Sequence, residues 1–95
     1  MALGDISFDT SAIHSAGNLL RAVGTIEASD TATEFAIVPN SSIVSASVFN
    51  IDDVDATVRV VINSSDGTEG SNPGSLYVDS SSSDVDTFRF DVLFA

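Results

Sequence analysis

The chain has 95 residues, of which 43% are hydrophobic, and it carries a formal net charge of −11. This length suits one domain with a modest core. Its only cationic side chains besides one histidine are three arginines, so it lacks the basic stripe that binding to nucleic acid requires. Cysteine is missing, which excludes disulfides and thiolate metal sites.

Residues 1–18 are expected to form an arm and a loop, and residues 19–95 a sandwich. The start has no basic segment followed by an apolar run, and no apolar stretch approaches the ~20 residues that cross a bilayer. We therefore expect a protein made and assembled inside a cell, without membrane contact. Ile6 and Phe8 alternate with polar residues, which predicts a short edge strand or an arm that pairs with a neighbouring copy. Residues 10–18 are small and polar and predict a loop or one helical turn.

The next residues predict two strands. The run 19–28 is extended in pattern, and its Gly24 is expected to mark a bulge. The run 33–38 predicts a strand with Glu34 on the solvent face. Pro39 ends that strand, because proline has no amide hydrogen for a ladder.

The segment from Ile43 to Asn63 contains two runs with a period of two, separated by an acidic turn. This pattern predicts one long antiparallel hairpin at the centre of the sandwich, with one face on the core. The residues expected on that face are Val44, Ala46, Val48, Val58, Val60 and Ile62.

The C-terminal third predicts a long loop and two strands. The loop, residues 64–75, contains an Asp-Gly and a Pro-Gly pair, both typical of turns. A short strand follows over 76–79, and the last strand, 85–94, places four large apolar residues on one face: Phe88, Phe90, Val92 and Phe94. This face is expected in the core or in a subunit interface. Since no helical periodicity occurs, the sequence predicts a single all-β domain, an antiparallel β-sandwich of about seven strands.

Catalytic residues are not indicated. His14 is the only histidine and could serve as a general base, but no acid neighbours it and no nucleophile-elbow motif is present. We therefore expect that the protein is not an enzyme and needs no cofactor.

The acidic turn is a candidate for binding a hard cation. Asn50, Asp52, Asp53 and Asp55 offer oxygen ligands close together, as calcium sites do. Val54 stands where alternate-residue ligation would need an oxygen, so a solvated turn is the favoured interpretation. The three aspartates remain weak metal candidates.

The surface offers two further features. Asn40 and Asn63 each begin a glycosylation sequon, although such matches are frequent in a serine-rich chain. Each arginine could form an ion pair within the chain or bridge to a carboxylate of a neighbouring subunit, and both interpretations stay open. The candidate interface residues are Ile6, Phe8, Arg21, Arg59, Arg89, Phe90 and Phe94.

The excess of carboxylates must be offset by salt, bound cations or contact with other subunits. Short aspartates in place of lysine keep a surface hydrated in concentrated salt. This balance resembles that of proteins from salt-adapted archaea and their viruses, although a generic acidic coat protein would share it.

The start MALGDI, the segment from Gly24-Thr25-Ile26 through Ile43 to Phe49, and the NPG loop before a closing strand resemble short β-sandwich virion proteins of tailed viruses. The resemblance covers most of the chain in layout. It implies a capsid decoration (cement) or minor capsid protein on the outer surface of the virion, assembled in the host cytoplasm. The implied partners are the major capsid protein and copies of the chain itself, commonly as a homotrimer. No functional residue is carried over, because this family has no catalytic motif.

A second hypothesis is a receptor- or glycan-binding module of a fibre, spike or tail. The serine-rich loops 64–75 and 80–84 would then contact the ligand, with Tyr77 as the candidate aromatic residue.

Overall fold

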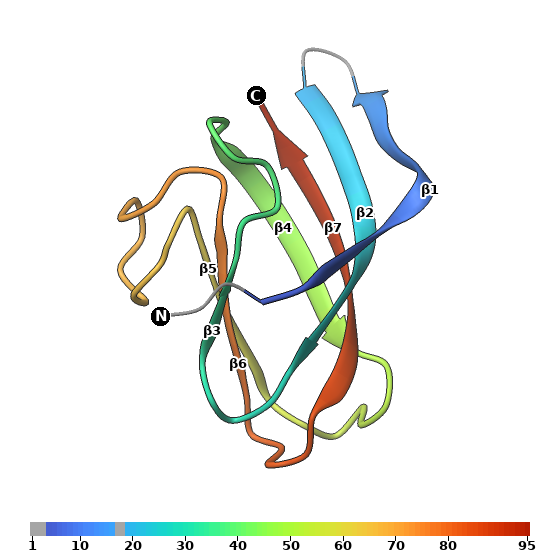
Figure 1. Ribbon diagram of the computed structural model, residues 1–95, viewed down its shortest axis with the longest axis vertical. Helices are drawn as coiled ribbons and strands as arrows, with labels where there is room; N and C mark the ends of the chain where they lie inside the picture. Colours follow the sequence, from blue (N-terminus) through green and yellow to red (C-terminus); the bar gives the residue numbers. More distant parts are fainter. Residues whose placement is uncertain (1–3, 17–18) are drawn as a thin grey trace.

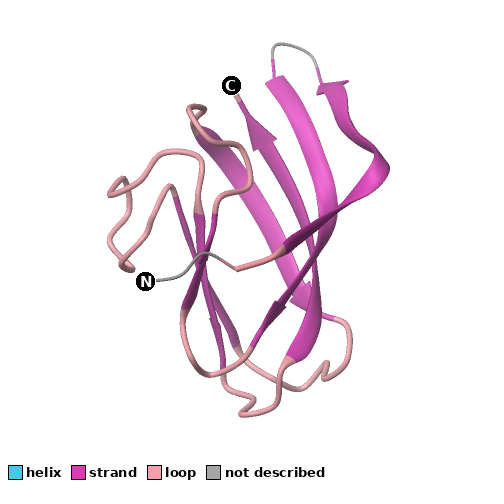
Figure 2. Cartoon of the chain, in the orientation of Figure 1, coloured by secondary structure: helices cyan, strands magenta, loops and turns pink. Residues whose placement is uncertain are grey.

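The structure is a computed structural model that describes residues 4–16 and 19–95, with only the backbone described for residues 9–16. This described part contains strands and loops and no helix (Figure 2). The seven strands are β1 (Ile6–Ala16), β2 (Leu19–Ala28), β3 (Thr33–Phe35), β4 (Ile43–Asn50), β5 (Val58–Ile62), β6 (Leu76–Ser80) and β7 (Asp86–Phe94). The predicted all-β fold with seven strands is confirmed.

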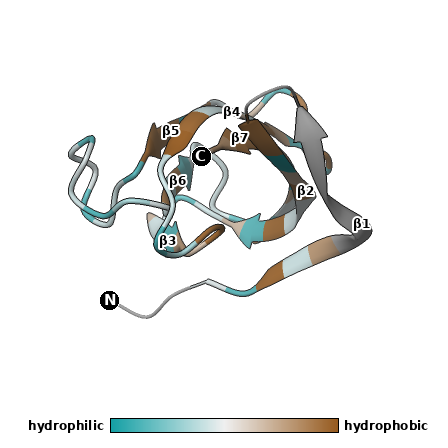
Figure 3. Cartoon of the chain, turned by 90° about the horizontal axis from the view of Figure 1, so that it is seen from above, coloured by the Kyte–Doolittle hydropathy of each residue, from teal (hydrophilic) through white to brown (hydrophobic). Residues whose placement is uncertain are grey.

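The strands form two antiparallel sheets, shown in Figure 1. The four-stranded sheet has the order β1-β2-β7-β4, and the three-stranded sheet has the order β3-β6-β5. Seen along the strands in Figure 3, the sheets enclose the core, and the connection between β5 and β6 projects to one side. The molecule is a small β-sandwich.

The core is built mainly around β7, which lies between β2 and β4. The predicted face of the last strand is confirmed, because its four large apolar side chains are all buried. They meet apolar side chains of both sheets, among them Ile26, Phe35, Leu76 and Val78. β-Branched and aromatic residues at every second position thus bury one face of each sheet.

The expected hairpin of residues 43–63 is wrong. β4 pairs with β7, whereas β5 pairs with β6 in the other sheet. The chain leaves the first sheet at Asn50, whose Oδ1 accepts hydrogen bonds from the backbone of Asp52 and Asp53. Both runs still direct apolar residues to the core, but they do so from opposite layers.

The prediction of a loop over residues 10–18 is also wrong for residues 10–16, which form part of a strand. Residues 17 and 18 lie outside the described part. β1 continues to Ala16 and pairs with β2 of the same chain at the edge of the sheet, as the edge-strand interpretation required. Its register shifts between Phe8 and Ile13, so the alternation that predicts a strand is interrupted there. The backbone amide of Gly4 donates to the carbonyl of Glu34, which ties the start of the described chain to β3.

Gly24 does not mark a bulge in its own strand. It lies in unbroken register with Phe90, and the irregularity belongs to β1. A Cβ atom on Gly24 would lie 2.4 Å from the carbonyl oxygen of Ser7 and 2.9 Å from the ring of Phe90. Glycine is therefore required here for close packing.

Two side chains differ in exposure from the prediction. Val44 is exposed, because the register of β4 shifts between Ile43 and Ser45 and Ile43 takes the core position. Glu34 is only 7% exposed, and its Oε2 accepts a hydrogen bond from Nδ2 of Asn72. This buried carboxylate is held by the 63–75 connection, which an alternation pattern cannot reveal.

The two predicted turns of the 64–75 loop are confirmed. Gly67 and Gly74 have φ angles of 91° and 87°. These positive angles are the ones that the predicted turns need at their glycine. The side chain of Asn63 fixes the base of this loop, since its Oδ1 accepts from the amides of Ile43 at 2.8 Å and Gly74 at 3.0 Å.

Candidate functional site

Negative charge is concentrated at one end of the sandwich. We call this the acidic end; it comprises the connections 29–32, 51–57 and 81–85 and the strand ends beside them, at the bottom of Figure 1. Eight of the 14 acidic residues lie there: Glu27, Asp30, Asp52, Asp53, Asp55, Asp79, Asp84 and Asp86. The connections 36–42 and 63–75 at the opposite end contain only Asp66 and Glu69.

The acidic end is held together by buried polar groups. Asn50 donates from Nδ2 to Oδ2 of Asp86 at 2.9 Å, and both residues are buried. Oδ2 of Asp52 accepts from the amide of Thr87 at 2.8 Å, and the amide of Ile51 donates to the carbonyl of Thr87 at 2.9 Å. The 51–57 connection is thereby fixed against the start of β7.

The carboxylates proposed as metal ligands support this loop. Asp52 binds the amide of Thr87, and Oδ1 of Asp53 accepts from the amide of Asp55. Among the described residues, no group of three or more histidine, cysteine or acidic side chains could hold a metal ion.

Apolar side chains project from the same end. Val54 is 84% exposed and Val85 is 68% exposed. Each stands between two aspartates, in Asp-Val-Asp tripeptides at 53–55 and 84–86. Phe49 and Ile51, close to Val54 in the sequence, are exposed as well. Exposed apolar groups are ordinary one at a time, but their grouping on so charged an end is typical of a contact surface.

The apolar residues predicted for an interface have different positions. Phe90 and Phe94 are buried in the core of a single copy, so their side chains are not presented to a partner. Phe8 is exposed at the sheet edge. Its ring packs edge-to-face against that of Phe90, with 5.8 Å between the ring centroids. Ile6 is partly buried against the core.

Two of the arginines form ion pairs within the chain. Arg21 donates from Nε to Oδ1 of Asp91 at 2.8 Å and from Nη2 to Oδ2 at 2.5 Å, which is a bidentate pair. This hydrogen bonding and charge lower the pKa of Asp91 and raise the pKa of Arg21. Arg59 lies over the ring of Tyr77, with its Nη1 3.8 Å from Oδ2 of Asp79.

The third arginine, Arg89, lies on β7 between Thr25 of β2 and Phe49 of β4. Its charge contributes to the lowered pKa of Asp91. Arg21, Arg89 and Asp91 thus lie close together on the outer face of the four-stranded sheet.

The remaining candidates do not converge on one site. The side chain of His14 lies outside the described part, although its backbone pairs with Arg21. The loops 64–75 and 80–84 lie at opposite ends of β6. The two loops and Tyr77 therefore do not form one binding face. Of the two sequon asparagines, Asn40 is exposed, whereas Nδ2 of Asn63 donates to the carbonyl of Ile43.

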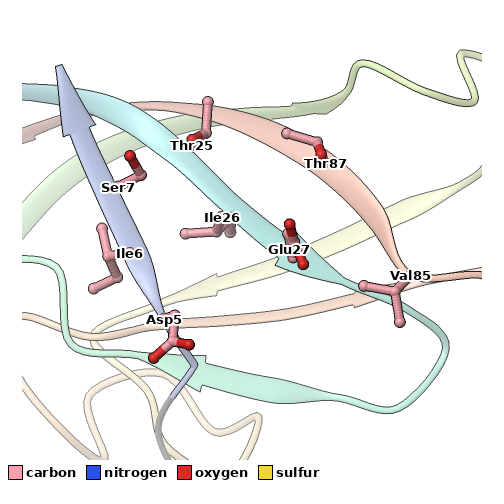
Figure 4. A pocket seen from close by; sticks show the side chains of 8 residues that line it. All are labelled: Asp5, Ile6, Ser7, Thr25, Ile26, Glu27, Val85 and Thr87. Carbon is pink, nitrogen blue, oxygen red and sulfur yellow. The ribbon is translucent and has the colours of Figure 1, made fainter.

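A depression of about 390 Å³ lies beside the acidic end, where β1 begins next to the end of β2 (Figure 4). Ile6, Ile26 and Val85 are its apolar neighbours, but Ile26 is buried in the core and Ile6 is packed against the core, so the exposed apolar side chain is that of Val85. The carboxylates of Asp5 and Glu27 also line it, and both residues are exposed.

Three hydroxyl groups complete the lining of this depression: Ser7, Thr25 and Thr87. Ser7 is paired with Thr25 across the β1–β2 ladder, and Thr87 is paired with Glu27 across the β2–β7 ladder. The depression therefore combines hydroxyl groups, two carboxylates and the exposed side chain of Val85.

A second depression, of about 620 Å³, lies at the opposite end. Its lining includes the amides of Asn40 and Asn72 and the hydroxyls of Ser41 and Ser42, and no acidic side chain. It offers amide and hydroxyl groups for hydrogen bonding.

Comparisons of the chain with protein-family models, with curated proteins and with solved structures found no match. In the part of the chain that the structure describes, no helix could span a membrane.

The sequence did not single out the depression beside β1 or the exposed valines. The valines did have a signal, because an apolar residue between two aspartates occurs twice, once in the predicted acidic turn and once at the start of the predicted last strand. The depression had none, since it depends on the pairing of β1 with β2 and of β2 with β7.

Proposed function

We propose that the protein is a structural component of a virus particle, a capsid decoration protein that binds the outer surface of the shell through its acidic end. The observation that carries the proposal is the pair of exposed valines, Val54 and Val85, at that end. Burying an aliphatic side chain of this size in a contact stabilises the contact by about 1.5 kcal/mol or more. The two-sheet fold and the resemblance of the sequence layout to that of small virion proteins support the same assignment.

The surrounding carboxylates favour a cationic patch on the major capsid protein as the partner surface. Complementary charge would direct the association and exclude docking of a second copy through the same end, because both ends would be anionic. Copies of the chain would instead meet through other faces, in the homotrimer that this class commonly forms.

The proposal is tested by the number of copies in purified particles. Quantitative mass spectrometry is expected to find hundreds of copies per particle, as for a shell component. A handful of copies would instead indicate a fibre, spike or tail part, and absence from particles would refute a role in the virion.

A double variant tests the attachment surface. Val54→Ser with Val85→Ser is expected to fold normally, because both side chains are exposed, and to be lost from particles. The matched control is Val44→Ser, since Val44 is also exposed but lies at the opposite end of β4. Equal incorporation of the double variant and the control would contradict attachment through the acidic end.

The second candidate function is glycan or receptor binding through the depression at the neutral end. Its amide and hydroxyl groups suit the hydroxyls of a sugar. Asn72 is oriented by its hydrogen bonds to Glu34 and Ser75. A glycan array separates the candidates: specific binding that Asn72→Ala abolishes would favour this function.

A further inference from the structure

We infer that the outer face of the four-stranded sheet is the surface through which copies of the chain contact one another. The outer face consists of the side chains of β2, β7 and β4 that point away from the core. The occupant of this face is a second copy of the chain. The inference deepens the proposed function, on which it rests for the expectation that several copies lie together on one shell.

The alternation of the strands defines the face. Every second residue of β7 is buried, so the residues between them point away from the core, and the same holds for β2. The ladders place three rows of side chains across β2, β7 and β4: Arg21, Leu93 and Ser45; Val23, Asp91 and Ser47; and Thr25, Arg89 and Phe49. Among the described residues no further strand or helix covers these rows, since β3, β6 and β5 form the opposite layer (Figure 3).

Apolar side chains interrupt the polar character expected of such a face. An antiparallel sheet with one face in water usually has polar residues at its outward positions. Here Phe49 is 54% exposed, and Ile51, two residues further along the chain, is 46% exposed. Val23 and Leu93 on the neighbouring strands are partly buried. Aromatic and aliphatic side chains that share a surface with arginine are typical of a contact between proteins.

The charge of the face identifies its occupant. Two of the three arginines but only two of the 14 acidic residues lie on it: Arg21, Arg89, Glu27 and Asp91. The face is therefore formally neutral, and the whole net charge of −11 lies on the rest of the chain. Two copies repel each other least when they approach through these faces, whereas a cationic partner is attracted to the acidic end.

The charged groups of the face are ordered within one copy. Arg21 and Asp91 form a bidentate pair, which restricts both side chains before any contact is made. Arg89 acts on the same carboxylate, because its charge contributes to the lowered pKa of Asp91. A surface whose side chains are already held loses less conformational entropy on association.

Contact through the outer face is compatible with attachment to a shell. Two such faces that meet form a pair, and three that are inclined about a common axis close a trimer. Val54 and Val85 lie in the connections at the ends of the strands and not in the rows of the face. Association of copies through the face therefore does not need the surface proposed for attachment.

The test is sedimentation velocity of the full chain at a salt concentration that keeps it folded, combined with a dilution series followed by nuclear magnetic resonance. The natural chain is expected to sediment as an oligomer that dissociates on dilution. The amides of Ser47 and Arg89 are expected to shift during dilution, whereas those of Asn40 and Glu69 should stay unchanged. A monomer at every concentration, or shifts confined to other surfaces, would overturn the inference.

A matched pair of variants locates the contact. Phe49→Thr is expected to weaken self-association about tenfold, because it removes exposed apolar surface from the face and keeps a residue suited to a strand. Leu20→Thr is the control: Leu20 is also exposed on this sheet, but it pairs with the buried Phe94 and so lies on the other side. Circular dichroism verifies that both variants fold. Equal self-association of Phe49→Thr and Leu20→Thr would overturn the inference.

The fate of this inference is separable from that of the capsid proposal. A chain that stays monomeric but has the copy number of a shell component would refute the contact and leave the capsid proposal in place. Association through the face by a chain that particles lack would do the reverse. Loss of Phe49→Thr from particles with unchanged self-association would overturn the inference, because the face would then belong to the contact with the shell.

Discussion

Asn40 and Asn63 have the same residue type and the same left-handed backbone, with φ angles of 67° and 53°. Their side chains have different surroundings. Asn40 is exposed, whereas the amide of Asn63 makes three hydrogen bonds that join β4 to the base of the 63–75 connection. The sequon pattern treats the two positions as equivalent, although only one has a structural role.

Asn63→Gly is therefore expected to destabilise the fold by about 2–3 kcal/mol, because it leaves partly buried backbone groups without partners. Glycine keeps the backbone conformation, so the loss isolates the side-chain hydrogen bonds. Asn40→Gly is the matched control and should change the free energy of unfolding by less than about 0.5 kcal/mol. Guanidinium unfolding measures both; equal effects would contradict the role given to Asn63.

The pair of Arg21 and Asp91 predicts a dependence of stability on pH. The pKa of Asp91 is lower in the folded chain than in the unfolded chain, so the pair stabilises the fold above the ordinary pKa of aspartate. This contribution is lost as the pH falls through the lowered value. Its size is small, since both side chains are largely solvated.

The measurement is the difference in unfolding free energy between the natural chain and Asp91→Asn from pH 7 downwards. The natural chain is expected to be more stable at pH 7, and the difference should vanish in the acid range below pH 4. A difference that stays constant as the pH falls would show that the carboxylate charge of Asp91 does not stabilise the fold.

At the scale of elements, β7 organises the sandwich. It is hydrogen-bonded on both sides, and its Phe90 is completely buried. Phe49 lies on the neighbouring β4 but is 54% exposed. Replacing each phenylalanine by alanine therefore compares the same substitution at a buried and at an exposed position.

Phe90→Ala is expected to cost about 3–5 kcal/mol, because it leaves a cavity between the sheets. Phe49→Ala should cost less than about 1 kcal/mol. Thermal unfolding followed by circular dichroism compares them, and failure of Phe90→Ala to fold would agree with the larger loss. A similar small loss for both variants would show that β7 is misplaced.

Elements with strong alternation and clear turns could be predicted from the sequence. This holds for β7, for β5, and for the Asp-Gly and Pro-Gly turns. Pairing partners could not be predicted, because alternation states which face is buried and not which strand lies alongside. The 43–63 hairpin failed for that reason, and β1 was missed beyond Phe8 because its register shifts there.

The candidate site depends on the same information. Asp52, Asp53 and Asp55 were recognised from the sequence as a cluster, but their place near the start of β7 follows only from the contact of the 51–57 connection with Thr87. The depression needs residues from three segments and had no sequence signal. Sequence alone indicated the charge of the surface and not its shape.

At the scale of the whole molecule, charge is unevenly distributed. The acidic end repels itself strongly, and salt of about 1 M shortens the screening length to about 3 Å, against about 8 Å at physiological ionic strength. Lowering the salt from molar concentration to the physiological range is therefore expected to lower the melting temperature or unfold the protein.

The control for that experiment is a variant in which Asp30, Asp55 and Asp84, all exposed at the acidic end, are replaced by asparagine. Its stability should depend less on salt. Circular dichroism and sedimentation that stay unchanged for the natural chain across the salt range would contradict the importance of this repulsion.

The account as a whole depends on the acidic end being a surface for contact with a viral shell. The most direct measurement is a cryo-electron-microscopy map of the native particle. We expect the sandwich on the outer surface of the shell, with Val54 and Val85 covered by the major capsid protein. A map in which the acidic end faces solvent, with the chain attached through its opposite end or missing from the shell, would contradict the account.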